Sequence, residues 1–149
     1  GQVFMASEKV VDDLYRDVDV YYIESEEEAL YEVLQKVAQT SNSYFNYEIN
    51  GIEKAQVMKY TAPSNGYSWH IDIGADGIAA NRKIAVSILL NEDYEGGEMA
   101  FRTAEQIEKV KPKTGEVVAF SSFISHSVRP ITKGERYVVV AWFTGPHFR

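Results

Sequence analysis

The sequence predicts a mainly β fold, a β-sandwich or jelly roll with one helix packed on its outside. From residue 44 onward, short runs of β-branched and aromatic residues alternate with Gly, Asn, Asp and Pro, a pattern typical of strands separated by turns. Ahead of these runs lies one segment with apolar residues at helical spacing. The length of 149 residues suits one domain, and we expect residues 1–149 to form it.

The first expected elements are a strand and the helix. A β-rich run over residues 18–23 predicts an early strand. The helix is expected over residues 25–40, because Ser25 and Glu28 match a capping box and the acidic residues near its start suit the positive end of the helix dipole. Its apolar stripe consists of Leu30, Val33, Leu34 and Val37.

Seven further strands are expected, at residues 44–49, 55–61, 67–73, 83–90, 98–102, 116–120 and 136–143. Strands at this spacing indicate a β-sandwich or jelly roll with the helix packed outside. Residues 104–112 fit either a helical turn or a short strand. Residues 74–82 form either a plain hairpin loop or a mobile lid that closes over a site.

Composition narrows the possible functions. The chain has no cysteine, which excludes disulfides, zinc–thiolate sites and cysteine nucleophiles and fits the cytoplasm, where we expect the protein. The net charge of −7 disfavours nucleic acid as a partner, because nucleic-acid binding depends on clustered Lys and Arg. No apolar run approaches the roughly 20 residues of a membrane span, and the N-terminus does not resemble a signal peptide. A domain of this length folds without a metal, so we expect any metal site to serve function.

The strongest local signal for chemistry is the triplet His70-Ile71-Asp72. Alternate residues of a strand share a face, so His70 and Asp72 point the same way with their Cα atoms roughly 6.6 Å apart. His126 follows the expected strand at residues 116–120 and supplies a second imidazole. Two imidazoles and one carboxylate form the facial triad of non-haem Fe(II) enzymes, which leaves positions open for 2-oxoglutarate and O2. His147, the remaining histidine, is interpreted as structural.

Arg136 lies ten residues after His126 and opens the last expected strand. Its planar fork suits the second carboxylate of a co-substrate, through two parallel hydrogen bonds. Period-two alternation places Val138, Val140 and Trp142 on the face of Arg136. If that face lines the interior, Trp142 packs near the metal. Tyr60, ten residues before His70, can donate its hydroxyl hydrogen to the co-substrate.

The combination Tyr60-x9-His70-x-Asp72 and His126-x9-Arg136 resembles the prolyl 4-hydroxylase-like branch of the 2-oxoglutarate/Fe(II)-dependent dioxygenases, and in particular the PKHD-type hydroxylases of bacteria and phages. Three stretches carry the resemblance: GIEKAQVMKYTAPSNGYSWHID, RKIAVSILLNEDYEGGEMAF and GEVVAFSSFISHSVRPITKGER. Together they span roughly residues 44–143.

The resemblance implies a double-stranded β-helix, which is a cupin-like jelly roll, and a set of cofactors. Fe(II) would be held by His70, Asp72 and His126, while 2-oxoglutarate would pair with Arg136 and contact Tyr60. Trp142 corresponds to a position behind the site. The co-substrates would be O2 and 2-oxoglutarate, which leaves as succinate and CO2, with ascorbate as a candidate reductant. Some relatives carry a tyrosine where this chain has Leu89.

The expected reaction is hydroxylation of an unactivated C–H bond, with a prolyl residue of a peptide or protein as the substrate that the resemblance favours. A free amino acid or another small molecule is the alternative substrate, and the oligomeric state is not predicted. Halogenating relatives lack the carboxylate ligand, so Asp72 favours hydroxylation. Nucleic-acid demethylases usually carry a second arginine six residues after the first, where this chain has Trp142.

Two readings from other classes stay open: a non-catalytic metal-binding or sugar-binding jelly roll, and a zinc hydrolase built on the same three ligands. Neither explains why an arginine follows the last ligand by ten residues.

Overall fold

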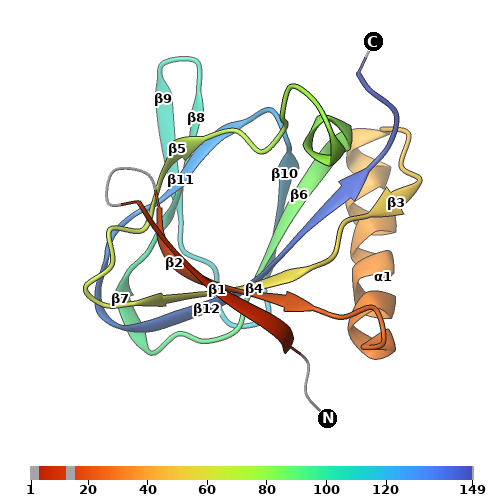
Figure 1. Ribbon diagram of the computed structural model, residues 1–149. Helices are drawn as coiled ribbons and strands as arrows, with labels where there is room; N and C mark the ends of the chain where they lie inside the picture. Colours follow the sequence, from red (N-terminus) through yellow and green to blue (C-terminus); the bar gives the residue numbers. More distant parts are fainter. Residues whose placement is uncertain (1–3, 13–15, 149) are drawn as a thin grey trace.

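The structure is a computed structural model that describes residues 4–12 and 16–148. In chain order its elements are β1 (Phe4–Asp12), β2 (Arg16–Ile23), α1 (Glu28–Phe45), β3 (Gly51–Ile52), β4 (Gln56–Thr61), β5 (Tyr67–His70), η1 (Ile78–Asn81), β6 (Arg82–Leu89), β7 (Tyr94–Gly96), β8 (Met99–Thr103), β9 (Gln106–Val110), β10 (Val117–Ser121), β11 (Ser125–Val128) and β12 (Ile131–Thr144). The mainly β fold with one flanking helix, which the sequence predicts, is confirmed (Figure 1).

The strands form one strongly curved sheet that closes around an interior (Figure 1). The order of neighbours is β10-β6-β12-β4-β2-β5-β11-β8-β9, and the pairs between described strands are antiparallel. β12 is the longest strand, with 14 residues. It pairs with β4 on one side and with β6 on the other. The short strands β3 and β7 pair with its two ends.

The two faces of the sheet bury two separate hydrophobic cores, as the alternation of side chains along a strand requires. On β12, Val138 and Trp142 face the interior core, whereas Val139, Ala141 and Phe143 face the second core. Leu34 of α1 is fully buried in this second core. The helix therefore covers the outside of the sheet and leaves the interior to the site (Figure 1).

Three expectations about elements are wrong. Residues 44–49 do not form a strand: α1 continues to Phe45, and Asn46 ends it in the left-handed conformation with φ 58°. The Asn42 side chain then bonds both the N–H and the carbonyl of Tyr47, each at 2.7 Å, which turns the chain away. The capping box is also wrong, because α1 begins at Glu28 and Glu27 at its N-cap makes no capping bond. The strand expected over residues 67–73 ends at His70.

The structure decides between the alternatives for residues 104–112 and describes the connection over residues 74–82. Residues 104–112 contain strand β9 and no helical turn, and the hairpin of β8 and β9 projects from the sheet (Figure 1). The connection over residues 74–82 contains the short 3-10 helix η1. In the described ranges 4–12 and 16–148, no helix has both the length and the apolar character that crossing a membrane requires.

Candidate metal and co-substrate site

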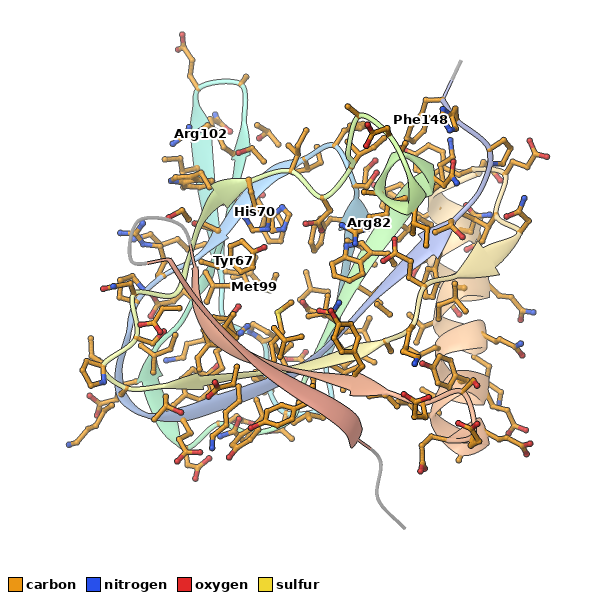
Figure 2. All side chains as sticks on the ribbon, viewed as in Figure 1. Tyr67, His70, Arg82, Met99, Arg102 and Phe148 are labelled. Carbon is orange, nitrogen blue, oxygen red and sulfur yellow. The ribbon has the colours of Figure 1, made fainter. Side chains whose placement is uncertain are left out.

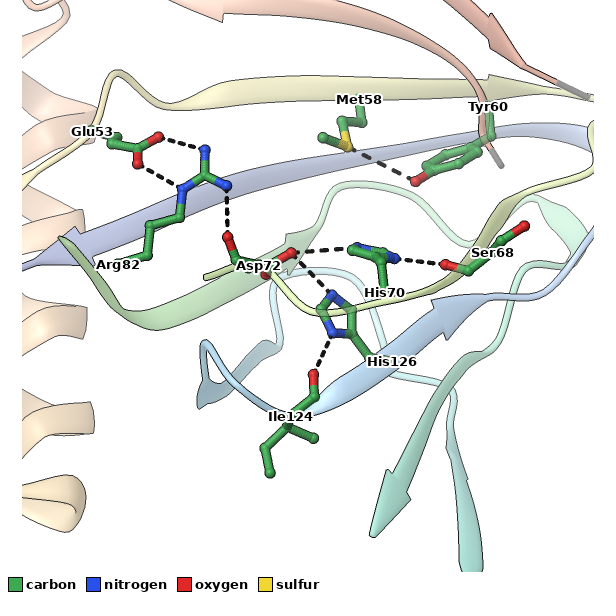
Figure 3. Close-up of polar contacts among 9 residues, drawn as sticks. All are labelled: Glu53, Met58, Tyr60, Ser68, His70, Asp72, Arg82, Ile124 and His126. Atoms are coloured by element: carbon green, nitrogen blue, oxygen red, sulfur yellow. Dashed lines mark hydrogen bonds and ion pairs between the residues drawn. The ribbon is translucent and has the colours of Figure 1, made fainter. Parts of the chain in front are cut away.

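His70, Asp72 and His126 converge at one point inside the curved sheet. One potential ligand atom from each lies within 4.8 Å of the others. Asp72 Oδ1 is 3.3 Å from His70 Nε2 and 3.4 Å from His126 Nε2 (Figure 3). The two histidines are brought together because β5 and β11 pair in a register that sets them directly opposite each other.

The main chain orients both imidazole rings. His70 Nδ1 is 2.6 Å from the carbonyl oxygen of Ser68, and His126 Nδ1 is 2.9 Å from that of Ile124 (Figure 3). A carbonyl oxygen only accepts hydrogen bonds, so each Nδ1 is the donor and each Nε2 is the ring nitrogen that faces Asp72. This arrangement fixes the tautomer that a metal-binding histidine uses.

Asp72 is ionised in this setting. Burial opposes its charge, but the contacts with His126 and His70 outweigh burial and hold the pKa of this carboxyl well below its usual value. A cation placed among the three groups would be shared by one carboxylate oxygen and two ring nitrogens. The donor set therefore fits a divalent cation that prefers nitrogen and oxygen ligands.

Aromatic rings enclose the two histidines. The Tyr67 ring stacks on His70 with centroids 4.0 Å apart. The Phe120 ring meets the ring of His126 edge-on at 4.5 Å. Figure 2 shows Tyr67 and His70 directed into the interior, with Met99 below them. The rings limit the access of water to the metal position and strengthen electrostatic interactions there.

Arg136 is buried without a counter-charge among the described residues. It projects from β12, is 1% exposed, and its Nε and Nη1 have no hydrogen-bond partner within that part of the chain. Its guanidinium carbon lies 5.3 Å from the centroid of the Tyr60 ring. An unpaired buried charge is costly, so the position of Arg136 fits a bound anion that supplies the missing partner.

One pocket joins the triad to Arg136. Tyr60 and Trp142 also line it, as does the β12 face that the alternation predicts, Val138 and Val140 included. The indole N–H of Trp142 forms no hydrogen bond of ordinary length among the described residues, but its proximity to Asp72 helps to hold the pKa of that carboxyl down. The pocket therefore has a metal-binding end, an anion-binding end and largely apolar walls.

Sequence reasoning did not single out several residues of the pocket. Tyr67, Ser87, Met99 and Phe120 all line it. Ser87 and Phe120 were detectable in principle, because each occupies an inward position in the alternation of a strand that was expected. Met99 and Tyr67 carry no such signal, since their role depends on how β8 and β5 are placed by the rest of the sheet.

Comparison with known families agrees with this geometry. The model of the 2OG-Fe(II) oxygenase superfamily matches residues 55–144. A PKHD-type hydroxylase of Alteromonas mediterranea is 33% identical over 86 residues, which are 53% of this chain and 38% of the relative. One from Prochlorococcus marinus is 35% identical over 88 residues, covering 57% and 40% of the two chains. The chain thus spans well under half the length of these curated relatives.

Solved structures share the fold. A Pseudomonas putida prolyl-4-hydroxylase superposes with a TM-score of 0.79 at 19% identity, over 94% of this chain and 78% of that one. A Trichoplax adhaerens prolyl hydroxylase, in complex with a peptide fragment of the hypoxia inducible factor oxygen degradation domain, gives 0.71 at 21% identity over 95% and 70%. A viral collagen prolyl hydroxylase from Paramecium Bursaria Chlorella virus-1, as its 2OG complex, gives 0.69 at 18% over 98% of each chain. The expected jelly roll is confirmed.

Proposed function

The chain belongs to the 2OG-Fe(II) oxygenase superfamily, and on that premise we propose that it is an Fe(II)- and 2-oxoglutarate-dependent dioxygenase that hydroxylates an unactivated C–H bond. The observation that carries the proposal is the pocket with the His70–Asp72–His126 cluster at one end and, at the other, Arg136, whose Nε and Nη1 have no partner among the described residues. A metal-chelating 2-oxo acid with a second carboxylate matches both ends.

Each residue has a defined task in this proposal. His70, Asp72 and His126 would hold Fe(II) through Nε2, Oδ1 and Nε2. Arg136 would bind the distal carboxylate of 2-oxoglutarate, and the indole N–H of Trp142 would supply a further donor. The hydroxyl of Tyr60, which donates to Met58 Sδ at 3.8 Å (Figure 3), would turn to the co-substrate. When bound, Fe(II) and 2-oxoglutarate would allow O2 to oxidise a C–H bond. The same reaction would convert 2-oxoglutarate to succinate and CO2.

The chain's own residues prepare the site for this chemistry. The carbonyls of Ser68 and Ile124 keep the imidazole lone pairs directed inward, and Asp72 keeps its charge. The walls of Phe120, Val138 and Val140 exclude water from the co-substrate. Exclusion of water matters because it protects a reactive site from side reactions.

We propose a prolyl residue of a peptide or protein as the substrate, with ascorbate as the reductant that keeps the iron ferrous. The PKHD-type hydroxylase relatives and the fold shared with prolyl hydroxylases support this choice. A free amino acid or another small molecule is the alternative. Release of succinate across panels of peptides and amino acids, with a mass gain of one oxygen atom in the product, would distinguish the two.

The first test is anaerobic addition of Fe(II) and 2-oxoglutarate. We expect a weak metal-to-ligand charge-transfer band in the visible spectrum, because the 2-oxo acid chelates the iron.

Replacement of Arg136 by Met keeps the volume of the side chain and removes its charge, so 2-oxoglutarate binding should fall by about 10-fold or more while metal binding persists. Absence of the band in the wild-type protein would favour a zinc hydrolase or a non-catalytic module. An equal loss of metal and 2-oxoglutarate binding in Arg136→Met would refute the role of Arg136.

A further inference from the structure

The side chain of Arg82 lies outside the pocket and holds the segment that carries Asp72. Its Nε and Nη2 donate to the two carboxylate oxygens of Glu53 at 2.6 and 2.9 Å, and its Nη1 donates to the main-chain oxygen of Asp72 at 3.0 Å (Figure 3). The guanidinium thus binds the Glu53 carboxylate through two nitrogens and the main-chain carbonyl of Asp72 through the third. This use of a planar fork is specific to arginine.

Asp72 needs such support because it lies beyond the end of β5. Regular sheet pairing does not fix its main chain. Its N–H donates to the carbonyl oxygen of Ser122 at 2.9 Å, and its own carbonyl accepts from Arg82. Ser122 is completely buried, and its hydroxyl donates to the main-chain oxygen of Arg82 at 2.6 Å. Arg82 therefore supports Asp72 directly through its side chain and indirectly through its main chain.

The same guanidinium also contacts Trp142. Its central carbon lies 3.9 Å from the centroid of the indole ring. Glu53 completes the arrangement, because its N–H donates to the main-chain oxygen of Trp142 at 3.0 Å. Arg82 and Glu53 thus link two pocket residues that come from distant parts of the chain.

We propose that Arg82 is a positioning residue for the metal site, with Glu53 as the counter-ion that holds its side chain in place. It fixes the main chain of Asp72, and through it the direction of the carboxylate, and it presses the indole of Trp142 against the pocket. The inference rests on the proposed function, since it concerns how that metal is held. It assigns a role to a residue that no sequence motif connects with the metal site.

The test measures metal binding without turnover. Mn(II) affinity would be determined by titration calorimetry, and the visible spectrum of the Co(II)-loaded protein would report ligand geometry. For Arg82→Met we expect Mn(II) to bind about 10- to 100-fold more weakly, the usual cost of removing a group that orients a metal ligand. Arg82→Lys retains the charge and one donor and should recover part of the loss. Glu53→Gln should alter the Co(II) spectrum, because the Arg82 guanidinium loses the carboxylate that holds it in place.

Lys54→Met is the matched control. Lys54 adjoins Glu53 and forms an ion pair of 2.8 Å with Glu24, away from the pocket, so its loss should change neither readout. A thermal unfolding curve for each variant separates positioning from general stability. The inference is overturned if all Arg82 and Glu53 variants that fold keep wild-type Mn(II) affinity and an unchanged Co(II) spectrum. It is also overturned if Lys54→Met shows the same losses. Wild-type protein that binds no divalent metal would instead overturn the proposed function.

Discussion

At the scale of residues, the fit between Arg136 and its surroundings depends on a glycine. Gly97 follows β7 and has φ +69°, a conformation that L side chains rarely adopt. A Cβ atom there would lie 3.0 Å from Arg136 Cδ and 3.1 Å from the ring of Tyr94. The absence of a side chain at position 97 therefore lets the arginine lie flat against the turn and reach the pocket.

Replacement of Gly97 by Ala should weaken 2-oxoglutarate binding by roughly 10- to 100-fold. The new methyl group would displace the Arg136 guanidinium, which could then no longer form two parallel hydrogen bonds with the distal carboxylate. Gly115→Ala is the control, since Gly115 has φ +84° with no atom within 4 Å of a built Cβ. Both variants should lose about 1–2 kcal/mol of folding free energy through the strained backbone. Calorimetric titration with 2-oxoglutarate in the presence of Mn(II) would measure the difference. Equal losses of affinity would show that the contact with Arg136 is unimportant.

The sequence predicts the candidate metal ligands and Arg136 better than it predicts the residues that hold them in position. His70, Asp72, His126 and Arg136 carry rare chemistry at fixed spacing, so the sequence alone indicates them. Nothing in the sequence marks Arg82 as a support of the metal site, because arginine side chains are mostly exposed. Its contacts with Glu53 and with the carbonyl of Asp72 arise only once segments far apart in sequence have packed together.

At the scale of elements, α1 and the sheet depend on each other through Leu34. This residue is fully buried in the outer core, whereas its neighbour Val33 is 50% exposed. Leu34→Ala should reduce the free energy of unfolding by about 2–5 kcal/mol, as large-to-small changes in a core do. Val33→Ala should change it by less than about 0.5 kcal/mol. Urea denaturation would measure both. Mn(II) affinity should stay at the wild-type value in both variants, since the sheet separates this core from the pocket. A reduced affinity in Leu34→Ala would contradict that separation.

The sequence predicts long, strongly alternating strands best and segments of mixed character worst. Residues 136–143 are apolar and β-branched, and they lie within β12 as expected. Residues 44–49 are rich in aromatic side chains, but Tyr44 and Phe45 close the helix, since helical bonding continues until Asn46 adopts a left-handed conformation. β11 was missed because its four residues, Ser125–Val128, show weak β propensity and are fixed by pairing with β5 and β8. β1 and β7 were missed as well.

At the scale of the whole molecule, metal binding should stabilise the fold, because the cluster exists only in the folded chain. A metal present at 100 times its Kd adds about 2.7 kcal/mol. For a chain of this length, that corresponds to a rise in Tm of about 5–10 °C. Differential scanning calorimetry with and without Mn(II) would measure the shift. Asp72→Ala should show a much smaller rise, and an equal rise in both proteins would mean that the metal binds elsewhere.

The mainly β character and the outer position of the helix followed from sequence patterns, but the number of strands and the neighbours of each strand did not. No local signal says that β5 lies between β2 and β11, and that placement is what sets His70 opposite His126. The closure of the sheet is decided by the sum of long-range contacts.

The length of β12 limits how this protein can change during evolution. Arg136 and Trp142 lie on one unbroken strand, and each must face inward. Insertion or deletion of one residue between them would turn one of the two toward the helix. The interval therefore tolerates exchange of side chains but no shift by an odd number of residues. The hairpin of β8 and β9 lies outside this interval, so a change in its length leaves the facing of Arg136 and Trp142 unaltered.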